Sequence, residues 1–283
     1  MVLWKRSRQS TNVRDLRGRG RGGLLGGGCL TVVIIIVALV LGVDPRPLLQ
    51  MGDAVQQQQQ STETGAPPAD DEQARFVAAI LGDTEDVWNR IFTDNDSDYQ
   101  EPVLTLFSGA VRSGCGNASA AMGPFYCPLD AGVYLDMSFF RELSDRFGAP
   151  GDFAAAYVIA HEVGHHVQNL TGVSDRVRRA QQAAAPAEAN TLSVRLELQA
   201  DCYAGIWAHH AQAQRQILEP GDIEEGLTAA AAIGDDRLQS RAGGAVVPES
   251  FTHGTSRQRV DWFTRGYRAG DPDQCDTFGA TSL

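Results

Sequence analysis

The hydrophobic and polar positions divide the chain into an apolar run near the N-terminus, a polar stretch and a long segment with mostly helical periodicity. Residues 24–43 contain no charged residue, and the Ile, Val and Leu residues among them form a continuous run without a period of 3.6 or 2. A helix of about 20 residues spans roughly 30 Å, the thickness of the hydrocarbon core of a bilayer. The run therefore predicts a transmembrane helix over 24–43.

Basic residues precede this run and predict its orientation. Seven of the eight charged residues in 1–21 are Lys or Arg, and such residues favour the cytoplasmic side of a membrane. We therefore expect a basic cytoplasmic arm over 1–23 and a single-pass cell-membrane protein whose remaining residues lie outside the cytoplasm. A cleaved signal peptide is the alternative, but Asp44 and Pro45 follow the run and offer no small-residue cleavage site.

The rest of the chain is acidic. Of 24 basic and 35 acidic residues, the first 21 residues hold seven and one, which leaves 17 basic against 34 acidic residues. Such a body repels nucleic acid, so we expect no nucleic-acid partner. Hydrophobic residues make up 43% of the chain, which is enough for a core and excludes wholesale disorder.

Two segments follow the apolar run. Residues 44–72 are rich in Gln, Ser, Thr, Gly, Pro and Ala and predict a flexible linker, whereas 73–283 has the length of one domain. Apolar spacing predicts a helix over 73–92 that is interrupted near Gly82, and β-like runs over 102–107 and 132–136. Further helices are expected over 138–147, 152–170 with Asp152 as its N-cap, 174–185, 191–218 and 222–238, and residues 262–267 close the domain. The pattern predicts a helix-rich α+β fold with a small sheet.

The helix expected over 152–170 contains the pentapeptide HEVGH at 161–165. Two His residues four positions apart share one face of a helix, so His161 and His165 can bind one metal ion. Glu162 is offset by one position and can hold a water molecule at the metal as a general base. The pattern predicts a zinc site, with two structural core histidines as the alternative.

A catalytic zinc ion usually takes three protein ligands and a water molecule. The next helix offers Glu197 and Asp201, which again share a face because they lie four positions apart. We expect Glu197 to be the third ligand and Asp201 to accept the free ring N–H of a ligating His. An exposed acidic stripe is the alternative. His166 points elsewhere around its helix and is expected at the surface or in packing.

These motifs carry a resemblance to known peptidases. HEVGH followed by ELQAD resembles the gluzincin class of zinc peptidases, whose third ligand is a Glu on a second helix. Residues 251–260, FTHGTSRQRV, resemble a segment of the CAAX-prenyl proteases and heat-shock membrane peptidases, with Gly254 in place of the usual Pro. Residues 73–278, with the basic arm and the apolar run, resemble the bacterial neutral zinc metallopeptidase family of membrane-anchored proteins. The stretches that carry this resemblance are GPFYCP, GVYLD, HEVGHHVQ, LELQADCYAG, AAAAIGDDRLQ and FTHGTSRQR.

The resemblance implies a zincin-like domain that holds one zinc ion per chain and hydrolyses a peptide or protein substrate. Zinc would polarise the scissile carbonyl and acidify a bound water molecule. Glu162 would take the proton of that water and deliver it to the leaving amine. His253 would stabilise the oxyanion. A zinc-containing binding or scaffold domain without turnover is the alternative.

The resemblance also implies where substrate binds. The strand at 132–136 resembles the edge strand of zincins, which binds extended peptide by strand addition. Val133, Tyr134 and Leu135 would then border the cleft, and Arg259 is a further cleft candidate. An ordinary core strand is the alternative for 132–136.

Four cysteines follow the apolar run and fit an oxidising compartment. Cys115 and Cys127 are close in sequence on either side of a Gly-containing loop, which leaves Cys202 and Cys275 as the second expected disulfide. Three connectivities are formally possible. Because no CxxC spacing occurs, a cysteine metal site is the weaker interpretation.

Overall fold

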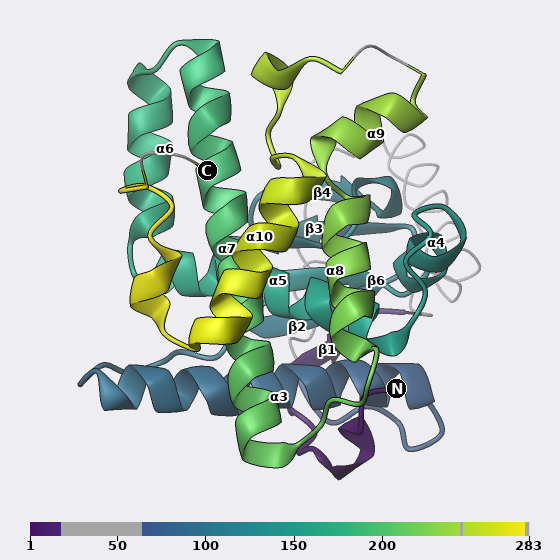
Figure 1. Ribbon diagram of the computed structural model, residues 1–283. Helices are drawn as coiled ribbons and strands as arrows, with labels where there is room; N and C mark the ends of the chain where they lie inside the picture. Colours follow the sequence, from purple (N-terminus) through teal and green to yellow (C-terminus); the bar gives the residue numbers. More distant parts are fainter. Residues whose placement is uncertain (18–63, 244–245, 281–282) are drawn as a thin grey trace, which may run out of the picture.

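The computed structural model describes residues 1–17, 64–243, 246–280 and 283. The predicted transmembrane segment 24–43 lies outside these residues, as does most of the predicted linker. Within the described residues, no helix is both long enough and apolar enough to span a membrane. The described part is a helix-rich α+β fold with a small mixed sheet, as the sequence predicts (Figure 1).

Four strands form the main sheet, and two more form a hairpin. The spatial order in the main sheet is β1 (Val13–Asp15), β2 (Val103–Phe107), β6 (Gly132–Asp136) and β5 (Phe125–Cys127). β1, β2 and β6 run parallel, whereas β5 is antiparallel to β6. The hairpin consists of β3 (Ala110–Ser113) and β4 (Gly116–Ser119). Among the described residues, β1 and β5 are therefore the edges of the main sheet.

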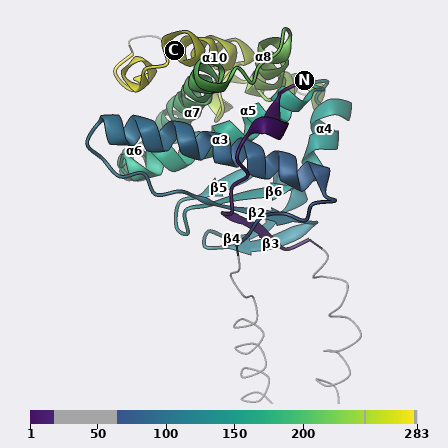
Figure 2. The ribbon, with the colours of Figure 1, turned by 90° about the horizontal axis from the view of Figure 1, so that it is seen from below.

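The two faces of the main sheet pack against different layers, because successive side chains of a strand point to opposite faces. Leu104 and Leu106 of β2 belong to the core that the sheet forms with the helices. Phe107 and Tyr134 belong instead to a smaller cluster with Val111 of the hairpin. The sheet thus lies between the helices and the β3–β4 hairpin (Figure 2).

Helices make up most of the described part. The α-helices are α3 (Glu72–Asp94), α4 (Phe139–Asp145), α5 (Asp152–Leu170), α6 (Val173–Ala183), α7 (Pro186–Arg215), α8 (Asp222–Ala232), α9 (Asp235–Arg241) and α10 (Ser256–Ala269), and the 3-10 helices are η1 (Trp4–Arg6), η2 (Ala120–Met122), η3 (Pro248–Ser250) and η4 (Pro272–Cys275). α5 contacts α3, α4, α6, α7 and α8 as well as β5 and β6, and most of its residues are buried. The pentapeptide HEVGH therefore lies in the interior of the molecule.

Two of the differences from the predicted helices occur at glycines. α3 continues through Gly82, which is a point of close approach, since a Cβ atom there would lie 2.5 Å from the carbonyl oxygen of Arg8. The helix expected over 222–238 is instead two helices, α8 and α9. They meet at Gly234, where a Cβ atom would lie 2.4 Å from the backbone nitrogen of Ser256. Both differences reflect contacts with distant parts of the chain.

Residues 1–17 belong to the folded body and do not form a separate arm. Val13 of β1 pairs with Leu104 of β2. Trp4 of η1 is buried in the main core and packs edge-on against Phe76 of α3. The segment, coloured purple, lies along α3 and the sheet in Figures 1 and 2. Short-range hydrophobic patterns do not reveal a three-residue strand of this kind.

Polar contacts join the same segment to the helices. Arg8 forms an ion pair of 2.8 Å with the buried Glu85 of α3. Asp152, expected as the N-cap of α5, is instead its first residue, and its carboxylate accepts a hydrogen bond of 2.9 Å from the backbone nitrogen of Val2. These contacts hold residues 1–17 against the domain.

Candidate metal centre and active site

The metal-ligand candidates lie where α5 packs against α7. The Nε2 atoms of His161 and His165 on α5 lie 3.2 and 3.4 Å from the two carboxylate oxygens of Glu197 on α7. One donor atom from each residue lies within 4.8 Å of the others. Gly164 allows the helices to approach, because a Cβ atom there would lie 2.9 Å from the carbonyl oxygen of Ala200. The structure thus brings together the three residues that the sequence indicates.

This set of donors fits a zinc ion. Two imidazoles and one carboxylate form a ligand set of catalytic zinc sites. The Nδ1 atom of His161 lies 2.9 Å from Asp201, and that of His165 lies 2.9 Å from Gln168. Each ring is therefore held through Nδ1 and turns Nε2 toward Glu197. Such contacts select the tautomer in which Nε2 is available to a metal.

The carboxylates control the charge of the site. Burial by itself raises the pKa of Glu197, but His165 and His161 lower it well below its ordinary value. Burial lowers the pKa of His161, but the neighbouring Asp201 and Glu197 outweigh this effect and raise it to about 10. Since zinc binds neutral imidazole, binding must release any protons that these carboxylates hold on the His ligands.

Asp201 is the centre of a buried hydrogen-bond network. Its carboxylate accepts from Nδ1 of His161, from the hydroxyl of Tyr157, and from Nε and Nη2 of Arg259 at 2.8 and 2.9 Å. Burial raises the pKa of Asp201, but Arg259 and His161 lower it more, so that the net pKa lies below the ordinary value. The ionised carboxylate is positioned to orient His161.

Two members of this network also line the cavity. Arg259, which the sequence suggests as a substrate-cleft residue, lines it together with Tyr157. The side chain of Arg259 is only 1% exposed, and its guanidinium is bonded to Asp201 and, at 3.2 Å, to Tyr157. The sequence analysis does not identify Tyr157. The spacing of Tyr157 could have identified it, because Tyr157 precedes His161 by four positions and therefore lies on the helix face that carries His161 and His165.

Glu162 lies beside the ligands and lines the same cavity. Its side chain is buried, and burial raises its pKa, an effect that His161 and His165 partly offset. A carboxylate whose pKa is raised toward neutrality can both accept and return a proton. Glu162 therefore has the position and the chemistry of a general base.

His253 lines this cavity from the loop before α10. Asp235 at the start of α9 holds the loop, since its Oδ2 atom accepts from the backbone nitrogens of Thr252, His253 and Gly254 at 2.7, 2.6 and 3.0 Å. Its Oδ1 atom lies 3.2 Å from Nδ1 of His253, whose side chain is 47% exposed, and this contact raises the pKa of His253. The sequence analysis does not identify Asp235, although it lies in the stretch AAAAIGDDRLQ. Gly254 has a φ of 89°, which Pro cannot adopt, so the loop differs from the Pro-containing segment that it resembles.

A cavity of about 690 Å³ joins these groups. His161, Glu162, His165, Glu197 and His253 all line it. Its other walls come from α4, α6, the segment 121–128 and the residues around α9. The structure therefore provides space for a substrate directly beside the candidate metal ligands.

The structure contradicts the predicted substrate-binding strand. β6 is an interior strand between β2 and β5, and the side chains of Val133, Tyr134 and Leu135 are at most 4% exposed. They pack into the two hydrophobic clusters and do not line the cavity. β5 is the antiparallel edge strand among the described residues, and its Phe125 and Tyr126 do line the cavity. The apolar pattern of 132–136 is that of a core strand.

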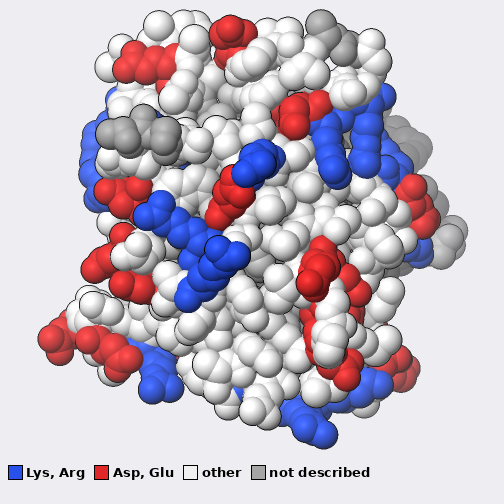
Figure 3. Space-filling model, viewed as in Figure 1, with Lys and Arg blue, Asp and Glu red and all other residues white. Residues whose placement is uncertain are grey.

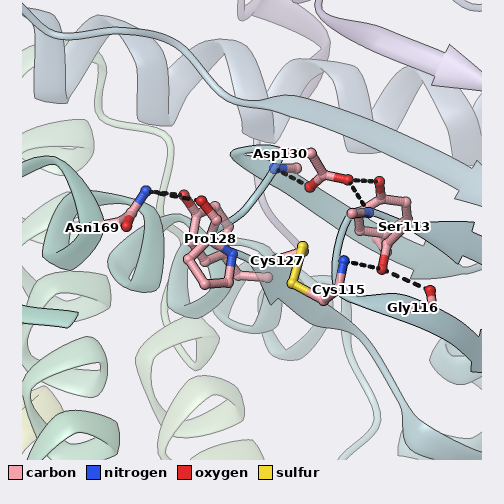
Figure 4. Close-up of a disulfide and its surroundings, with 11 residues drawn as sticks. Ser113, Cys115, Gly116, Cys127, Pro128, Asp130 and Asn169 are labelled. Atoms are coloured by element: carbon pink, nitrogen blue, oxygen red, sulfur yellow. Dashed lines mark hydrogen bonds between the residues drawn. A yellow bond between two sulfur atoms is a disulfide. The ribbon is translucent and has the colours of Figure 1, made fainter. Parts of the chain in front are cut away.

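Both expected disulfides are present. Cys115 in the β3–β4 turn is joined to Cys127 of β5 (Figure 4), and Cys202 of α7 is joined to Cys275 of η4. Asp130 accepts a hydrogen bond of 2.6 Å from the backbone of the β3–β4 turn. The first disulfide thereby fixes the hairpin beside the strand that lines the cavity, and the second fixes the C-terminal segment on the helix that carries Glu197.

Charged groups are dispersed over the face shown in Figure 3. Blue and red groups alternate there with broad uncharged surface, and the described residues form no continuous basic surface on this face. The cavity itself has both signs at its walls, with Arg146 and Arg178 as well as Glu142 and Asp175. Neither surface favours a polyanion.

The chain matches a known protein family over nearly its whole length. The match covers residues 2–278, and the family is described as "Putative neutral zinc metallopeptidase". The chain belongs to this family. The region that matches the family thus begins at residue 2 and includes η1 and β1 of the folded body.

Similar bacterial proteins cover most of the chain. "Uncharacterized protein YpfJ" of Escherichia coli K12 is 50% identical over 98% of this chain and 99% of its own length. "Uncharacterized protein Rv2575" of Mycobacterium tuberculosis H37Rv is 44% identical over 87% of this chain and 86% of its own length. No solved structure matches the chain significantly.

Proposed function

We propose that this protein hydrolyses peptide bonds with one zinc ion held by His161, His165 and Glu197. The observation that carries the proposal is the presence of Glu162 in the same cavity as these three donors. A structural zinc site is closed by four protein ligands, whereas a catalytic site has three and leaves one position open. Three donors that face a cavity match the catalytic arrangement.

Zinc would supply Lewis-acid chemistry, which polarises the scissile carbonyl and acidifies a water molecule. Glu162 would accept a proton from that water and return it to the leaving amine, a role that its raised pKa supports. Asp235 holds His253 through Nδ1 and favours its protonated form, in which Nε2–H would donate to the developing oxyanion. Asp201 would keep His161 oriented throughout.

We propose that the peptide substrate lies in extended form along β5. An edge strand can add a further strand through its backbone, and β5 is the edge that lines the cavity. Phe139 and Phe147 also line the cavity and would accept an apolar side chain of the peptide. An antiparallel edge strand beside the HEVGH helix supports a zincin-like fold of the gluzincin type.

We also propose that the domain functions outside the cytoplasm, at a membrane that residues 24–43 contact. The two disulfides support this location because disulfides persist in oxidising compartments. The pairing of β1 with β2 supports a position of residues 1–17 on the same side as the domain. A cytoplasmic position for these residues is therefore not part of the proposal.

A peptide-library digest tests the activity. The full chain with zinc should cleave the library, and Glu162→Gln should lose cleavage while it retains zinc. Glu188→Gln on α7 is the matched control, because Glu188 is exposed and outside the cavity, and it should cleave as the unaltered protein does. Stoichiometric zinc without any cleavage by the unaltered protein would contradict a peptidase and favour a zinc-containing scaffold domain.

A further inference from the structure

His165 is held by an amide, whereas His161 is held by a carboxylate. Nδ1 of His165 donates to Oε1 of Gln168 at 2.9 Å, and the Gln168 side chain is fully buried on α5. Gln168 follows His165 by three positions, so the two side chains are neighbours on the helix surface. Gln168 therefore contacts a candidate ligand directly.

The orientation of this amide is set by α7. Nε2 of Gln168 donates to the carbonyl oxygen of Leu196 at 2.7 Å and to Oε1 of Gln199 at 3.1 Å. A reversed amide would bring its NH₂ group against the N–H of His165 and its oxygen against two acceptors. The acceptors on α7 thus select the orientation in which the Gln168 oxygen faces the His165 ring.

The chain of hydrogen bonds continues to the C-terminal segment. Nε2 of Gln199 donates to the carbonyl oxygen of Cys275 at 2.9 Å. Cys275 is joined to Cys202, and both side chains are fully buried. The disulfide holds the carbonyl group of Cys275 against α7, where it accepts the hydrogen bond from the side-chain amide of Gln199. Arg195 contributes to the same attachment through hydrogen bonds to the carbonyl oxygens of Thr277 and Ala280.

We propose that Gln168 and Gln199 are positioning residues for His165, and that the Cys202–Cys275 disulfide is part of this support. The series His165, Gln168, Gln199, Cys275 contains a donor and an acceptor at every step, so its members fix one another. It ties the second ligand on α5 to the helix that carries Glu197. The proposal rests on the zinc site of the proposed function but not on peptide hydrolysis.

Zinc affinity measured by chelator competition on the full chain tests Gln168. Gln168→Met keeps the length of the side chain but removes both of its hydrogen-bonding roles, and should weaken zinc binding about 10- to 100-fold, as loss of a hydrogen bond to a ligating His does. Gln239→Met is the matched control, because Gln239 also bridges two segments, through Ser250 and Val247, but lies outside this series. It should bind zinc as the unaltered protein does.

The two disulfides provide a second matched pair. Cys202→Ser with Cys275→Ser should weaken zinc binding, whereas Cys115→Ser with Cys127→Ser should lower only the melting temperature. Two further measurements separate an effect on ligand geometry from an effect on folding. The melting temperature of the zinc-free variants reports stability, and the absorption spectrum of bound cobalt reports the geometry of the metal ligands. General destabilisation leaves the cobalt spectrum of the folded fraction unchanged.

Three outcomes are decisive. Unaltered zinc affinity and cobalt spectrum in Gln168→Met would overturn the positioning role, and the same result in the Cys202 and Cys275 double variant would overturn the part assigned to the disulfide. A full chain that binds no zinc would overturn the proposed function and this inference together.

Discussion

Arg259 of α10 donates two hydrogen bonds to the carboxylate of Asp201, from Nε at 2.8 Å and from Nη2 at 2.9 Å. The same carboxylate accepts from Nδ1 of His161. A residue 58 positions away in the sequence therefore holds the group that orients a candidate metal ligand. Both side chains of this ion pair are almost completely buried. Removal of one partner therefore costs more stability than it would in an exposed pair, because the other charge is left buried without a counter-charge.

Arg259→Gln should destabilise the protein strongly, because it leaves Asp201 buried without its cation. Removal of one partner of a buried pair costs about 3–5 kcal/mol. Arg257→Gln on the same helix is the control, since Arg257 is exposed in its pair with Asp261, and such pairs contribute about 0–1 kcal/mol. Urea unfolding measures both. Equal losses in the two variants would contradict the importance of the buried pair.

His165→Ala and Glu197→Ala should each retain less zinc than the unaltered protein. Each change removes one of three donors that lie within 4.8 Å of one another. Elemental analysis after dialysis measures the retained metal, with Glu188→Ala as the control on an exposed face of α7. Full stoichiometric zinc in both variants would show that the ligand assignment is wrong.

His253→Ala should lower kcat and kcat/KM together while zinc content stays unchanged. An oxyanion donor acts mainly in the transition state, and loss of one typically costs about 10²–10³ in turnover. Asp235→Asn should produce a smaller loss, because it loosens the loop but leaves the ring in place. Steady-state rates and metal analysis test both. If His253→Ala lowers only the melting temperature, His253 is a loop residue, and if it loses zinc, His253 is a ligand.

The His253–Asp235 pair should make stability depend on pH. The pKa of His253 is raised in the folded protein, chiefly by its hydrogen bond to Asp235. Protonation therefore favours the folded state, and this contribution is fully present below the unfolded pKa of about 6.5 and is lost as pH rises through the raised folded value. The melting temperature of the protein, compared with that of His253→Asn, should show an excess at acidic pH that disappears as the pH rises. A constant difference would exclude this linkage.

Residues 1–17 and the domain should be accessible from the same side of the membrane. Single cysteines at the exposed positions Thr11 and Asp98, in a Cys29→Ser background, can be labelled in intact cells with a membrane-impermeant maleimide. Because β1 is a strand of the main sheet, both positions should label alike. Opposite labelling would show that a single crossing separates β1 from β2 and that this pairing does not form in the membrane-bound protein.

The sequence alone determined the features that depend on local geometry. HEVGH in a helix places His161 and His165 on one face whatever surrounds it, because the helical repeat is a property of the backbone. The same repeat brings Glu197 and Asp201 to one face of α7. Sequence proximity only suggested the disulfides, since Cys115 and Cys127 are 12 residues apart but three connectivities were formally possible, and the structure decides between them.

Only the tertiary structure decided which distant segments meet. The sequence of β6 predicts a short apolar strand but does not show whether another strand pairs with its edge. In the structure β5 pairs with that edge, and β5 rather than β6 lines the cavity. Gly234 ends a helix because the backbone of Ser256 passes beside it, and Asp235 holds His253 across 18 positions. Residues 1–17 carry a basic pattern that predicts a separate arm, but Val13 and Trp4 are buried among residues from far along the chain. Burial energy is gained wherever complementary surfaces meet, and that depends on the whole chain rather than on any local pattern.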